Sequence, residues 1–432
     1  MIRLPKQVQT VISRLNAAGH EAWLVGGSVR DAFMGKEPHD FDMATSALPD
    51  EVMRVFSGER VIETGLKHGT VTVLIGGMPL EITTFRAGGS GEYAKTLRED
   101  MLHRDLTMNA IAYHPEHGFE DPFGGCEDIR RGIIRCVENA EERILEDPLR
   151  IMRAARFSSV FGFAIEPETQ SAMDKHRQRL LGVSAERLAS ELIKLLCGRD
   201  ARRVLVEQID AIGVFIPEIL PMKGFDQRNP HHIYDVLQHT AAAVENVPSE
   251  PVLRLTMLLH DIGKPYTFTL AENGIGHFYG HAAVSTEKAD AILSRLKLDN
   301  FTRERVVQLI RYHDHVIEPE TRLVKRMLGR LTPEVFDQLI LVKRADNMAQ
   351  HPDYRSRQSD LDELARIKAE VLESQQCFSL KDLALNGRDL IALGAKPGPR
   401  LGEMLEKLLE AVINEEAENT REALSAYAKA LL

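Results

Sequence analysis

The pattern of apolar residues changes once along the chain, near residue 140, and this change limits the folds available. Before it, short alternating stretches are separated by glycine-rich turns. After it, apolar residues recur every three or four positions almost to the last residue. Alternation indicates strands, whereas recurrence with a period near 3.6 indicates helices. We therefore expect an α+β protein with a mixed sheet near the N-terminus and only helices beyond it.

Stretches of the first part indicate particular elements. Apolar residues recur at helical spacing over 8–15, which predicts an N-terminal helix. Residues 22–25 are apolar and end at a Gly-Gly pair, as a strand entering a tight turn does. Residues 70–75 and 80–85 both alternate, so we expect a hairpin whose turn lies at 76–79.

Helical periodicity dominates the rest of the chain. Residues 356–362 are polar and are interpreted as a hinge or surface loop, and prolines predict a domain boundary near residue 225. Helices are predicted over 144–157, 185–196, 252–259, 287–296, 303–312, 334–348 and 400–413.

The charge of the chain argues against a strongly basic nucleic-acid binder. It has 54 Lys and Arg against 64 Asp and Glu, a net charge of −10, whereas phosphate binding usually shows as a basic surplus. Contact with nucleic acid would therefore need local basic patches. Two are predicted, each equally consistent with a solvated charged face: Arg322, Lys325, Arg326 and Arg330, and Lys194, Arg199, Arg202 and Arg203.

The cysteines and the apolar runs bear on the compartment. Four scattered cysteines without a C-x-x-C pair indicate neither a disulfide framework nor a thiolate zinc site, and reduced thiols are typical of the cytoplasm. No apolar leader precedes a small-residue cleavage site, and no apolar run approaches roughly 18 residues. We therefore expect a cytoplasmic protein without a membrane span.

A glycine pair followed by two carboxylates is the first cluster with chemical meaning. Asp40 and Asp42 are two residues apart, a spacing that puts both carboxylates on one face of a strand. Adjacent carboxylates favour a cation between them, and Mg²⁺ suits them because it takes oxygen ligands and shares its shell with substrate phosphates. Gly27 lets the backbone approach a triphosphate, Ser28 can donate to a phosphate oxygen, and Arg30 can neutralise charge.

Residues 24–42 resemble the first motif of the nucleotidyltransferase superfamily that includes DNA polymerase beta. More narrowly, they resemble bacterial class II tRNA nucleotidyltransferases, the CCA-adding enzymes, and their poly(A) polymerase relatives. The resemblance covers nearly the whole chain and implies a polymerase-beta-like head followed by all-α domains. It continues, in the family's order, at 103–110 (HRDLTMNA), 121–125 (DPFGG) with Asp128 and Arg135, 146–150 (EDPLR) with Arg153 and Arg156, 386–390 (NGRDL) and 394–401.

The resemblance implies transfer of nucleotides from CTP and ATP to the 3′ end of tRNA. Asp40 and Asp42 would hold catalytic Mg²⁺, with Glu81 as a third carboxylate. Asp147 and Arg150 would read the base, since a carboxylate accepts from the amino group of cytosine or adenine. From spacing alone, an i,i+3 ion pair on a solvated helix face is the simpler interpretation. The implied nucleotide-binding residues are Gly27, Ser28, Arg30, Arg104, Asp105, Asn109, Asp147, Arg150, Arg153 and Arg156.

Two departures from the family pattern leave the added bases open. His103 stands where the family has Arg, which weakens one possible phosphate contact. The segment from Arg86 to His103 is shorter than in most CCA-adding relatives, and family members that add only CC lack this loop. The short segment therefore raises the alternative of a CC-adding enzyme. Two further alternatives are a poly(A) polymerase, which shares the motifs of the head, and a phosphodiesterase whose activity lies in the helical half and whose head only binds RNA.

Histidines and aspartates on apolar helical stretches form a second cluster. His239 is followed by the doublet His260-Asp261 and then by Asp346, and burying such groups unpaired would be costly. Their order resembles HD-type phosphohydrolases, in which these four residues would bind a divalent transition metal. Imidazole and carboxylate ligands suit Mn²⁺, Ni²⁺, iron or Zn²⁺.

Three further residues extend the second cluster. His281 and His313 match the additional ligands of HD members that hold two metals. Lys264, three residues after Asp261, either holds a phosphate or ends a helix at the surface.

The resemblance divides the chain into four parts. These are a nucleotidyltransferase head at 1–138, a helical neck for base recognition at 139–225, an HD metal-binding domain at 226–350 and a helical, tRNA-binding tail at 351–432. The oligomeric state stays open between monomer and homodimer.

Overall fold

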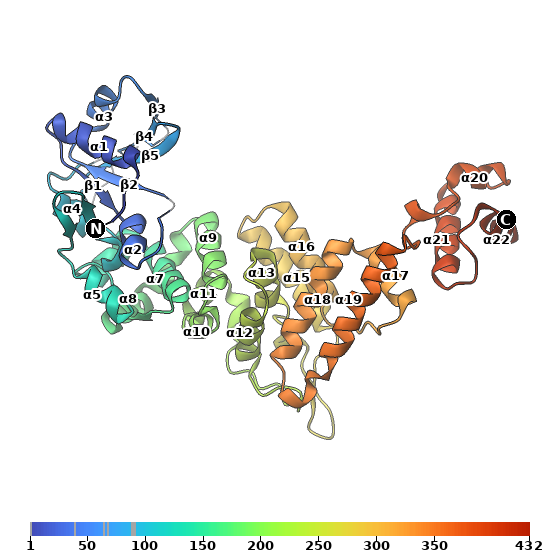
Figure 1. Ribbon diagram of the computed structural model, residues 1–432. Helices are drawn as coiled ribbons and strands as arrows, with labels where there is room; N and C mark the ends of the chain where they lie inside the picture. The colour runs from blue at the N-terminus through green and yellow to red at the C-terminus, as the bar shows by residue number, and fades with distance from the viewer. Residues whose placement is uncertain (1, 39, 64, 67–68, 88–91) are drawn as a thin grey trace. The chain divides into compact units, whose positions relative to one another are not determined.

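The computed structural model describes residues 2–432 apart from 39, 64, 67–68 and 88–91. The chain forms two compact units, Met1–Pro217 and Glu218–Leu432 (Figure 1). The first combines a sheet with helices, and the second is almost entirely helical, so the predicted fold class is confirmed.

The first unit contains a seven-stranded mixed sheet in the order β3-β4-β5-β2-β1-β6-β7. Strand β2 pairs with β5 in parallel, and every other neighbouring pair is antiparallel. The strands are β1 (Ala22–Val25), β2 (Asp42–Thr45), β3 (Arg60–Ile62), β4 (Thr70–Ile75), β5 (Met78–Thr84), β6 (Ala112–His114) and β7 (Gly118–Glu120).

The predicted hairpin is confirmed with a tighter turn than expected. Ile75 pairs directly with Met78, so only Gly76 and Gly77 connect the strands. Both glycines have positive φ, 55° and 82°, the conformation of a two-residue turn whose twist matches that of the flanking strands. The second strand therefore begins at Met78 rather than at residue 80.

Helices cover the sheet and supply its core. The predicted N-terminal helix, α1, buries its apolar stripe completely, and it contacts both β1 and α3. Leu97 and Met101 of α4 pack with Val25, Ala44 and Phe85 in one cluster. The helices of this part are α1 (Lys6–Ala17), α2 (Gly27–Phe33), α3 (Pro49–Val55), α4 (Leu97–Leu102), the 3₁₀ turn η2 (Thr107–Asn109) and α5 (Gly125–Arg131).

The prediction of one continuous helix over 144–157 is wrong. Helix α6 ends at Glu146 and α7 begins at Leu149, with Asp147 extended at φ −144° and ψ 100°. The residue before a proline is driven out of the helical region by the proline ring, and Pro148 follows Asp147. Asp147 therefore lies at the joint between two helices rather than on a helix face.

The rest of the first unit is helical. Helix α9 matches its predicted span of 185–196. The elements are β8 (Ile133–Ile134), α6 (Ala140–Glu146), α7 (Leu149–Phe161), β9 (Ala164–Ile165), α8 (Pro167–His176), η3 (Arg177–Gly182), α9 (Ala185–Leu196), α10 (Ala201–Glu207) and α11 (Ile209–Phe215).

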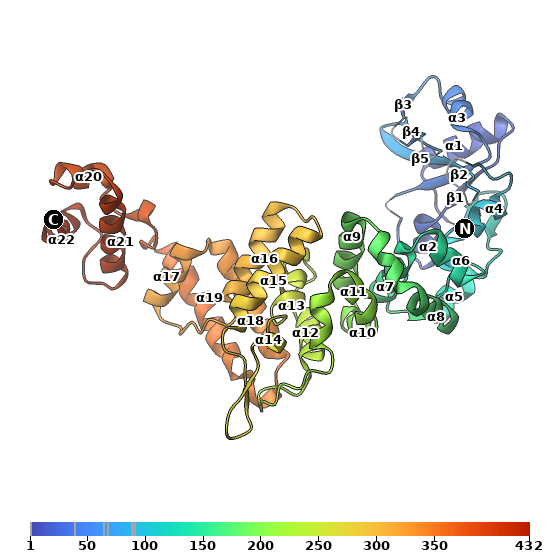
Figure 2. The same ribbon diagram turned by 180° about the vertical axis from the view of Figure 1, so that it is seen from behind.

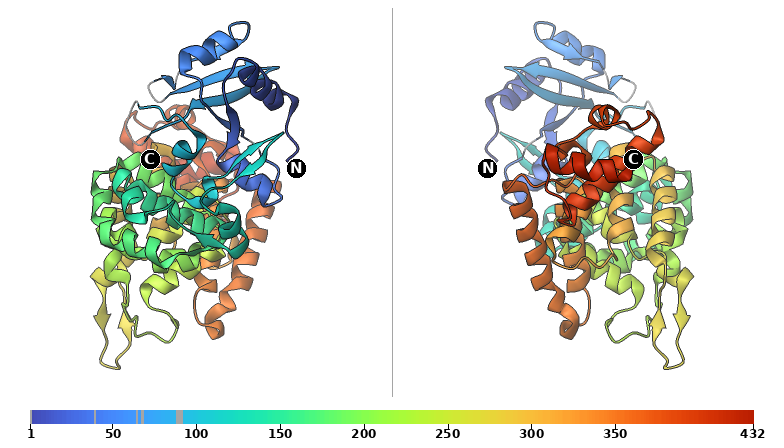
Figure 3. Two further views of the ribbon diagram at one scale, coloured as in Figure 1. Left: turned by 90° about the vertical axis from the view of Figure 1, so that its left-hand side faces the viewer. Right: turned by 90° about the vertical axis from the view of Figure 1, so that its right-hand side faces the viewer.

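The second unit contains the later predicted helices, and Figure 3 shows its short β10–β11 hairpin in yellow. Its elements are η4 (Pro217–Met222, from the last residue of the first unit), α12 (Val236–Asn246), α13 (Pro251–Leu259), α14 (Lys264–Thr267), β10 (Thr269–Leu270), β11 (Gly276–His277), α15 (His281–Arg295), α16 (Asn300–Tyr312), α17 (Thr321–Arg330), α18 (Pro333–Met348), η5 (Pro352–Arg357), α19 (Gln358–Glu373), η6 (Leu380–Asp382), α20 (Gly387–Ala392), α21 (Pro399–Ile413) and α22 (Arg421–Leu431).

Two predictions about this unit are wrong. The polar stretch 356–362 is no loop, because it spans the end of η5 and the start of α19, whose Leu361 and Leu364 are buried while its polar residues form the solvent face. Lys325 is only 7% exposed, so the residues predicted as one basic surface of α17 do not all face solvent.

The other predicted basic patch is largely engaged within the first unit. Arg199 donates to the carbonyl of Phe161, and Arg203 pairs with Asp200 and Glu207. Within the described part of the chain, no helix combines the length and apolarity needed to cross a membrane.

Candidate nucleotide site and metal centre

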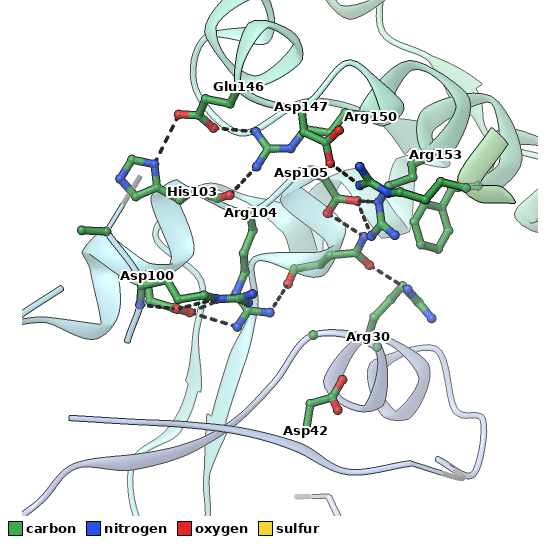
Figure 4. A pocket seen from close by; sticks show the side chains of 17 residues that line it. Arg30, Asp42, Asp100, His103, Arg104, Asp105, Glu146, Asp147, Arg150 and Arg153 are labelled. Carbon is green, nitrogen blue, oxygen red and sulfur yellow. Dashed lines mark hydrogen bonds and ion pairs between the residues drawn. The ribbon is translucent and has the colours of Figure 1, made fainter. Parts of the chain in front are cut away.

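A cavity of about 580 Å³ in the first unit collects the sequence motifs of the head and of α6–α7 (Figure 4). Of the predicted nucleotide-binding residues, all but Ser28 and Arg156 line it. The lining is Gly26, Gly27, Arg30, Asp42, Arg86, Ala87, Asp100, His103, Arg104, Asp105, Asn109, Glu146, Asp147, Arg150, Arg153, Phe157 and Arg187.

The predicted catalytic carboxylates lie at the start of β2 and on its neighbour. Asp42 is the first residue of β2 and lines the cavity, whereas Asp40 precedes the strand, so the expectation that both lie on a strand holds only for Asp42. Glu81 of β5 is directly in register with Asp42 but is not part of the cavity lining.

The charges around Asp42 favour a cation. Loss of hydration raises the pKa of Asp42, Arg104 opposes this rise, and the nearby Asp40 carboxylate adds to it. A divalent cation bound to both carboxylates would remove their repulsion, and oxygen ligands are those that Mg²⁺ prefers. The donor set therefore fits the predicted magnesium ion.

Gly26, at the turn between β1 and α2, cannot carry a side chain without strain. Its φ is +72°, and a Cβ atom there would lie 3.2 Å from Nη1 of Arg104 and 4.0 Å from Oδ2 of Asp42. Only glycine adopts this conformation freely, so the glycine pair lets the backbone turn tightly against the charged wall of the cavity.

Asp100 anchors the arginines of this wall and was missed by the sequence analysis. Its carboxylate, 1% exposed, lies 2.9 Å from Nη2 of Arg104 and 3.8 Å from Nε of Arg86. The i,i+4 spacing of Asp100 and Arg104 was the available signal. With Asp100 buried, Arg104 is held in place beside Gly26.

A chain of hydrogen bonds links the head to α7. Nη1 of Arg30 donates to Asn109 at 2.7 Å, and the amide of Asn109 donates to Asp105 at 3.0 Å. Nη2 of Arg153 lies 2.6 Å from the same Asp105. Burial alone would raise the pKa of Asp105, but Arg153 and Asn109 outweigh it and hold that pKa below its usual value.

Asp147 is held from two sides. The backbone N–H of Leu149 donates to Oδ1 at 3.1 Å, and Nη2 of Arg187 donates to Oδ2 at 2.7 Å. Arg187 comes from the first turn of α9, forty residues away, and no local sequence signal pointed to it. The two donors hold the carboxylate in place at the helix joint.

Arg150 is held by a separate set of acceptors. Nη1 donates to Glu146 at 2.7 Å and to the carbonyl of Arg143 at 2.8 Å, and Nη2 donates to the carbonyl of His103 at 2.7 Å. The i,i+3 ion pair with Asp147 is therefore not what positions it. Asp147 and Arg150 line one cavity as an acceptor and a donor with independent supports.

The two predicted residues outside the lining have other partners. Ser28 is buried and its hydroxyl donates to the carbonyl of Val25 at 3.2 Å. Arg156 donates to Glu191 at 2.5 Å and lies 3.7 Å from the centre of the Phe157 ring. Both lie on elements that form the cavity, and their predicted contacts with nucleotide stay predictions.

The second unit brings together all six predicted metal ligands of the helical half. Five contacting helices, α12, α13, α15, α16 and α18, carry or adjoin them (Figure 2). The ligands form two groups, and Asp261 belongs to both. Within each group the ligand atoms lie within 4.8 Å of one another. These groups are His239, His260, Asp261 and Asp346, and Asp261, His281 and His313.

The four imidazoles of this centre share one orientation. Each Nδ1 faces a backbone carbonyl: His260 that of Met257 at 2.7 Å, His281 that of Phe278 at 2.9 Å, His313 that of Ile310 at 2.6 Å and His239 that of Ala349 at 3.4 Å. A proton on Nδ1 leaves the Nε2 lone pairs free, which is the usual arrangement of metal-binding histidines.

The Nε2 atoms converge on carboxylates and on each other. Nε2 of His239 lies 2.9 Å from Asp346, and Nε2 of His281 lies 3.4 Å from Asp261 and 3.2 Å from Nε2 of His313. Nε2 of His260 is buried without a hydrogen-bond partner among the described residues. These donors fit divalent transition metals, with Asp261 between the two groups.

Lys264 is buried beside the metal centre, so the alternative of a surface helix end is wrong. It is 6% exposed, and its Nζ lies 2.7 Å from Oδ2 of Asp261 and 3.0 Å from the amide oxygen of Gln227. The ammonium therefore contacts the same carboxylate oxygen of Asp261 that faces Nε2 of His239 and of His260.

Comparison with known proteins decides the family. A CCA-adding enzyme of Levilactobacillus brevis is 31% identical over 436 residues, covering 98% of this chain and 96% of that enzyme. This chain belongs to the CCA-adding enzyme family. A CCA-adding enzyme of Geobacillus kaustophilus is 32% identical over 437 residues, with 98% and 96% coverage. The chain is thus a nucleotidyltransferase, as the sequence motifs implied.

A solved structure of this family has the same fold along the whole chain. The Bacillus stearothermophilus CCA-adding enzyme in complex with CTP is 30% identical, with a TM-score of 0.73 and coverage of 99% of this chain and 97% of that one. The predicted membership of the CCA-adding enzyme family is therefore confirmed.

Three family models match successive parts of the chain. They are described as "Poly A polymerase head domain" (residues 22–135), "Probable RNA and SrmB- binding site of polymerase A" (162–219) and tRNA nucleotidyltransferase domain 2 (267–428). The head match contains Asp40, Asp42 and Glu81. The doublet His260-Asp261 lies between the second and third matches, so the metal centre rests on its own geometry.

Proposed function

We propose that this member of the CCA-adding enzyme family adds C, C and A in turn to the 3′ end of tRNA, using CTP and ATP. One observation carries the proposal: Asp42 lines the same cavity as Asp147 and Arg150. A single nucleotide in that cavity would meet a metal-binding carboxylate with its phosphates and a base-reading pair with its base. The solved relative with CTP supports a nucleotide as the ligand.

The proposed chemistry is phosphoryl transfer to the RNA end. The 3′-hydroxyl oxygen forms a bond to the α-phosphorus, the bond to pyrophosphate breaks, and the hydroxyl proton is lost to solvent. When bound to Asp40 and Asp42, with Glu81 alongside, Mg²⁺ would supply charge neutralisation for the triphosphate. Arg30 and Arg104, both anchored in the cavity wall, would bind phosphate oxygens.

Base choice follows from the polarity of the reading pair. The Asp147 carboxylate accepts hydrogen bonds, so it favours cytosine and adenine, whose amino groups donate. Uracil and guanine place a carbonyl oxygen there, which the carboxylate repels. Arg150 would donate to the ring acceptors, and both residues are positioned by contacts that do not involve a nucleotide.

A second candidate function is addition of CC only. Arg86 and Tyr93 form an antiparallel bridge, Ala87 donates to the carbonyl of Glu92 at 3.1 Å, and Ala94 donates to the carbonyl of Phe85 at 2.8 Å. These bonds bring residues 86–87 beside residues 92–93, so that only residues 88–91, which lie outside the described part of the chain, connect them. A connection this short favours the interpretation as a CC-adding enzyme, because those enzymes lack the flexible loop.

Sequencing the 3′ ends made on transcribed tRNA decides among these functions. With tRNA lacking CCA, we expect products ending in CCA. Products that stop at CC with both nucleotides present would replace the proposal by its CC-adding alternative. Long adenosine tracts would indicate a poly(A) polymerase, which the acidic 351–432 segment disfavours. Asp42→Asn, which keeps the shape of the side chain but removes its charge, is the control for activity from this cavity.

We further propose that the second unit holds divalent transition metal, such as Mn²⁺, Ni²⁺, iron or Zn²⁺, and hydrolyses phosphate esters. The shared orientation of the four imidazoles supports metal binding. With Nδ1 protonated, the Nε2 atoms of His281 and His313 face each other, and those of His239 and His260 face carboxylates, without a proton to share. Metal analysis of the purified chain and of His260→Gln tests this, and equal metal content in both would contradict it.

The proposed activities divide among four segments. The head at 1–138 would transfer the nucleotide, the neck at 139–225 would read the base, 226–350 would hold the transition metal, and the tail at 351–432 would bind tRNA. We place this work in the cytoplasm, where reduced thiols are usual.

A further inference from the structure

The metal centre of the second unit is closed on most sides. The side chains of His239, His260, Asp261 and His313 are at most 2% exposed and that of His281 is 8% exposed. Asp346 differs from these five ligands, because 24% of its side chain is exposed. A substrate would therefore have to reach the centre at Asp346.

A cavity of about 170 Å³ lies at this opening, and Asp346 and His313 line it. Its other walls come from the segment after α16, from α18 and from α19. Ile317, Leu361 and Leu364 make one side apolar. The volume is well below the roughly 300–1,000 Å³ of sites that enclose drug-sized ligands, so the cavity fits a phosphate with a compact organic group rather than a whole nucleotide.

Lys343 provides a hydrogen-bond donor for such a phosphate. Its Nζ donates to the carbonyls of His313 at 2.6 Å and His315 at 2.5 Å, and the side chain lines the cavity. An ammonium group has three donors. The two carbonyls therefore hold Lys343 in place while one N–H is left for a ligand.

Arg357 provides a second cation at the rim. It lines the cavity from the end of η5 and is exposed. Within the described part of the chain, its guanidinium has neither a hydrogen bond nor an ion pair. A guanidinium without a carboxylate partner can bind phosphate oxygens in a bidentate manner.

Carboxylates limit when an anion can enter. Asp314, Glu318 and Asp360 line the same cavity as Lys343 and Arg357, so the cavity without metal carries more negative than positive charge. Divalent cations at the neighbouring centre would reverse this balance. Binding of phosphate should therefore depend on metal.

We propose that this cavity is the substrate pocket of the metal centre and that it takes a phosphate monoester of a compact alcohol. Lys343 and Arg357 bind the phosphate, and the apolar wall receives the organic group. The proposal rests on the hydrolase function proposed above. In the reaction, a water oxygen forms a bond to phosphorus, the ester P–O bond breaks, and the alcohol leaves with a proton from that water.

Binding of inorganic phosphate to the Mn²⁺-loaded full-length chain, measured by calorimetry, tests the pocket without relying on turnover. We expect at least tenfold weaker binding in Arg357→Ala and in Lys343→Gln, where glutamine keeps donors for the two carbonyls but loses the charge. Arg366→Ala is the matched control, because Arg366 lies on the exposed face of α19 and pairs with Glu363 and Glu370. Its affinity should match that of the parent chain.

Hydrolysis of p-nitrophenyl phosphate gives a second readout. We expect Arg357→Ala to raise KM about tenfold with kcat within threefold, and 5′-CMP to be a poorer substrate than the small ester. Unchanged phosphate affinity and KM in both variants would overturn the pocket while leaving the metal centre intact. A parent chain that binds no Mn²⁺ would overturn the proposed metal centre, and the pocket with it.

Discussion

The cavity of the first unit and the candidate metal centre of the second unit both gather acidic side chains, but they give them different partners. In the cavity, Asp100, Asp105 and Asp147 each have an arginine within 3 Å. In the candidate metal centre, Asp346 faces histidine nitrogens, and Asp261 faces both histidine nitrogens and the ammonium of Lys264. The acidic groups of the cavity are therefore paired with arginines, whereas those of the candidate metal centre lie mainly among imidazole nitrogens, a donor set that suits the proposed metal.

The strongest test of this contrast is Asp42→Asn. We expect nucleotide addition to fall on the order of 1,000-fold or more, because the carboxylate would hold the metal that neutralises the transferring phosphate. Release of phosphate by the second unit should be unchanged. Incorporation of labelled CTP into tRNA and hydrolysis of p-nitrophenyl phosphate measure the two activities.

The matched control for this variant is Asp50→Asn, an exposed residue of α3 outside the cavity lining. It should keep both activities. A parallel loss of both activities in Asp42→Asn would mean that the two sites are not independent.

Removal of metal should lower the stability of the helices around the candidate metal centre and leave that of the sheet unchanged. A ligand at 100 times its dissociation constant stabilises a fold by about 2.7 kcal/mol, so chelation should loosen the helices around the metal centre. Hydrogen exchange should become faster in α12, α13 and α16 and stay unchanged in β1 and β2. Equal protection of α13 with and without chelator would argue against metal at this centre.

Loss of the Arg187 guanidinium should weaken base discrimination. Arg187→Ala frees Oδ2 of Asp147, and charged hydrogen bonds are worth about 1.5–3 kcal/mol, less at a half-exposed site. We expect the preference for CTP over UTP to fall by up to about tenfold, with partial rescue in Arg187→Lys. The measurement is kcat/KM for each nucleotide.

Arg54→Ala serves as the control for this variant, since Arg54 is 76% exposed and contacts Glu51 and the carbonyl of Asp50, both on its own helix α3. It should leave the base preference unchanged. An unaltered preference in Arg187→Ala would show that Asp147 is positioned without its arginine partner.

Gly26→Ala should have the smallest effect of the changes considered, and it should act through the stability of the first unit. A residue with a Cβ atom pays about 1–2 kcal/mol at positive φ, and the new methyl group would press on Arg104. Thermal unfolding should show this loss, and nucleotide addition should fall several-fold. Gly58→Ala is the control, because its Cβ position is open and its φ is not in the left-handed region.

Much of the architecture could be predicted from local patterns. Alternation predicted β4 and β5, and helical spacing predicted α9 to the residue. Each of these elements is stabilised by burying one apolar face, and the spacing of the apolar residues shows that face directly. The exceptions have local causes as well. Pro148 breaks the predicted helix at Asp147. The polar stretch 356–362 spans the end of η5 and the start of α19, whose buried residues begin only at Leu361.

The sequence by itself determined the chemical inventory: the carboxylates Asp40 and Asp42, the reading pair, and six metal-type ligands in a recognisable order. Only the tertiary structure decided their partners. Asp147 pairs with Arg187 of α9 rather than with Arg150, and His239 meets Asp346 across 107 residues. Hydrogen-bond partners depend on which helix ends pack together in space. A local sequence pattern does not show which segments, far apart in the chain, will meet.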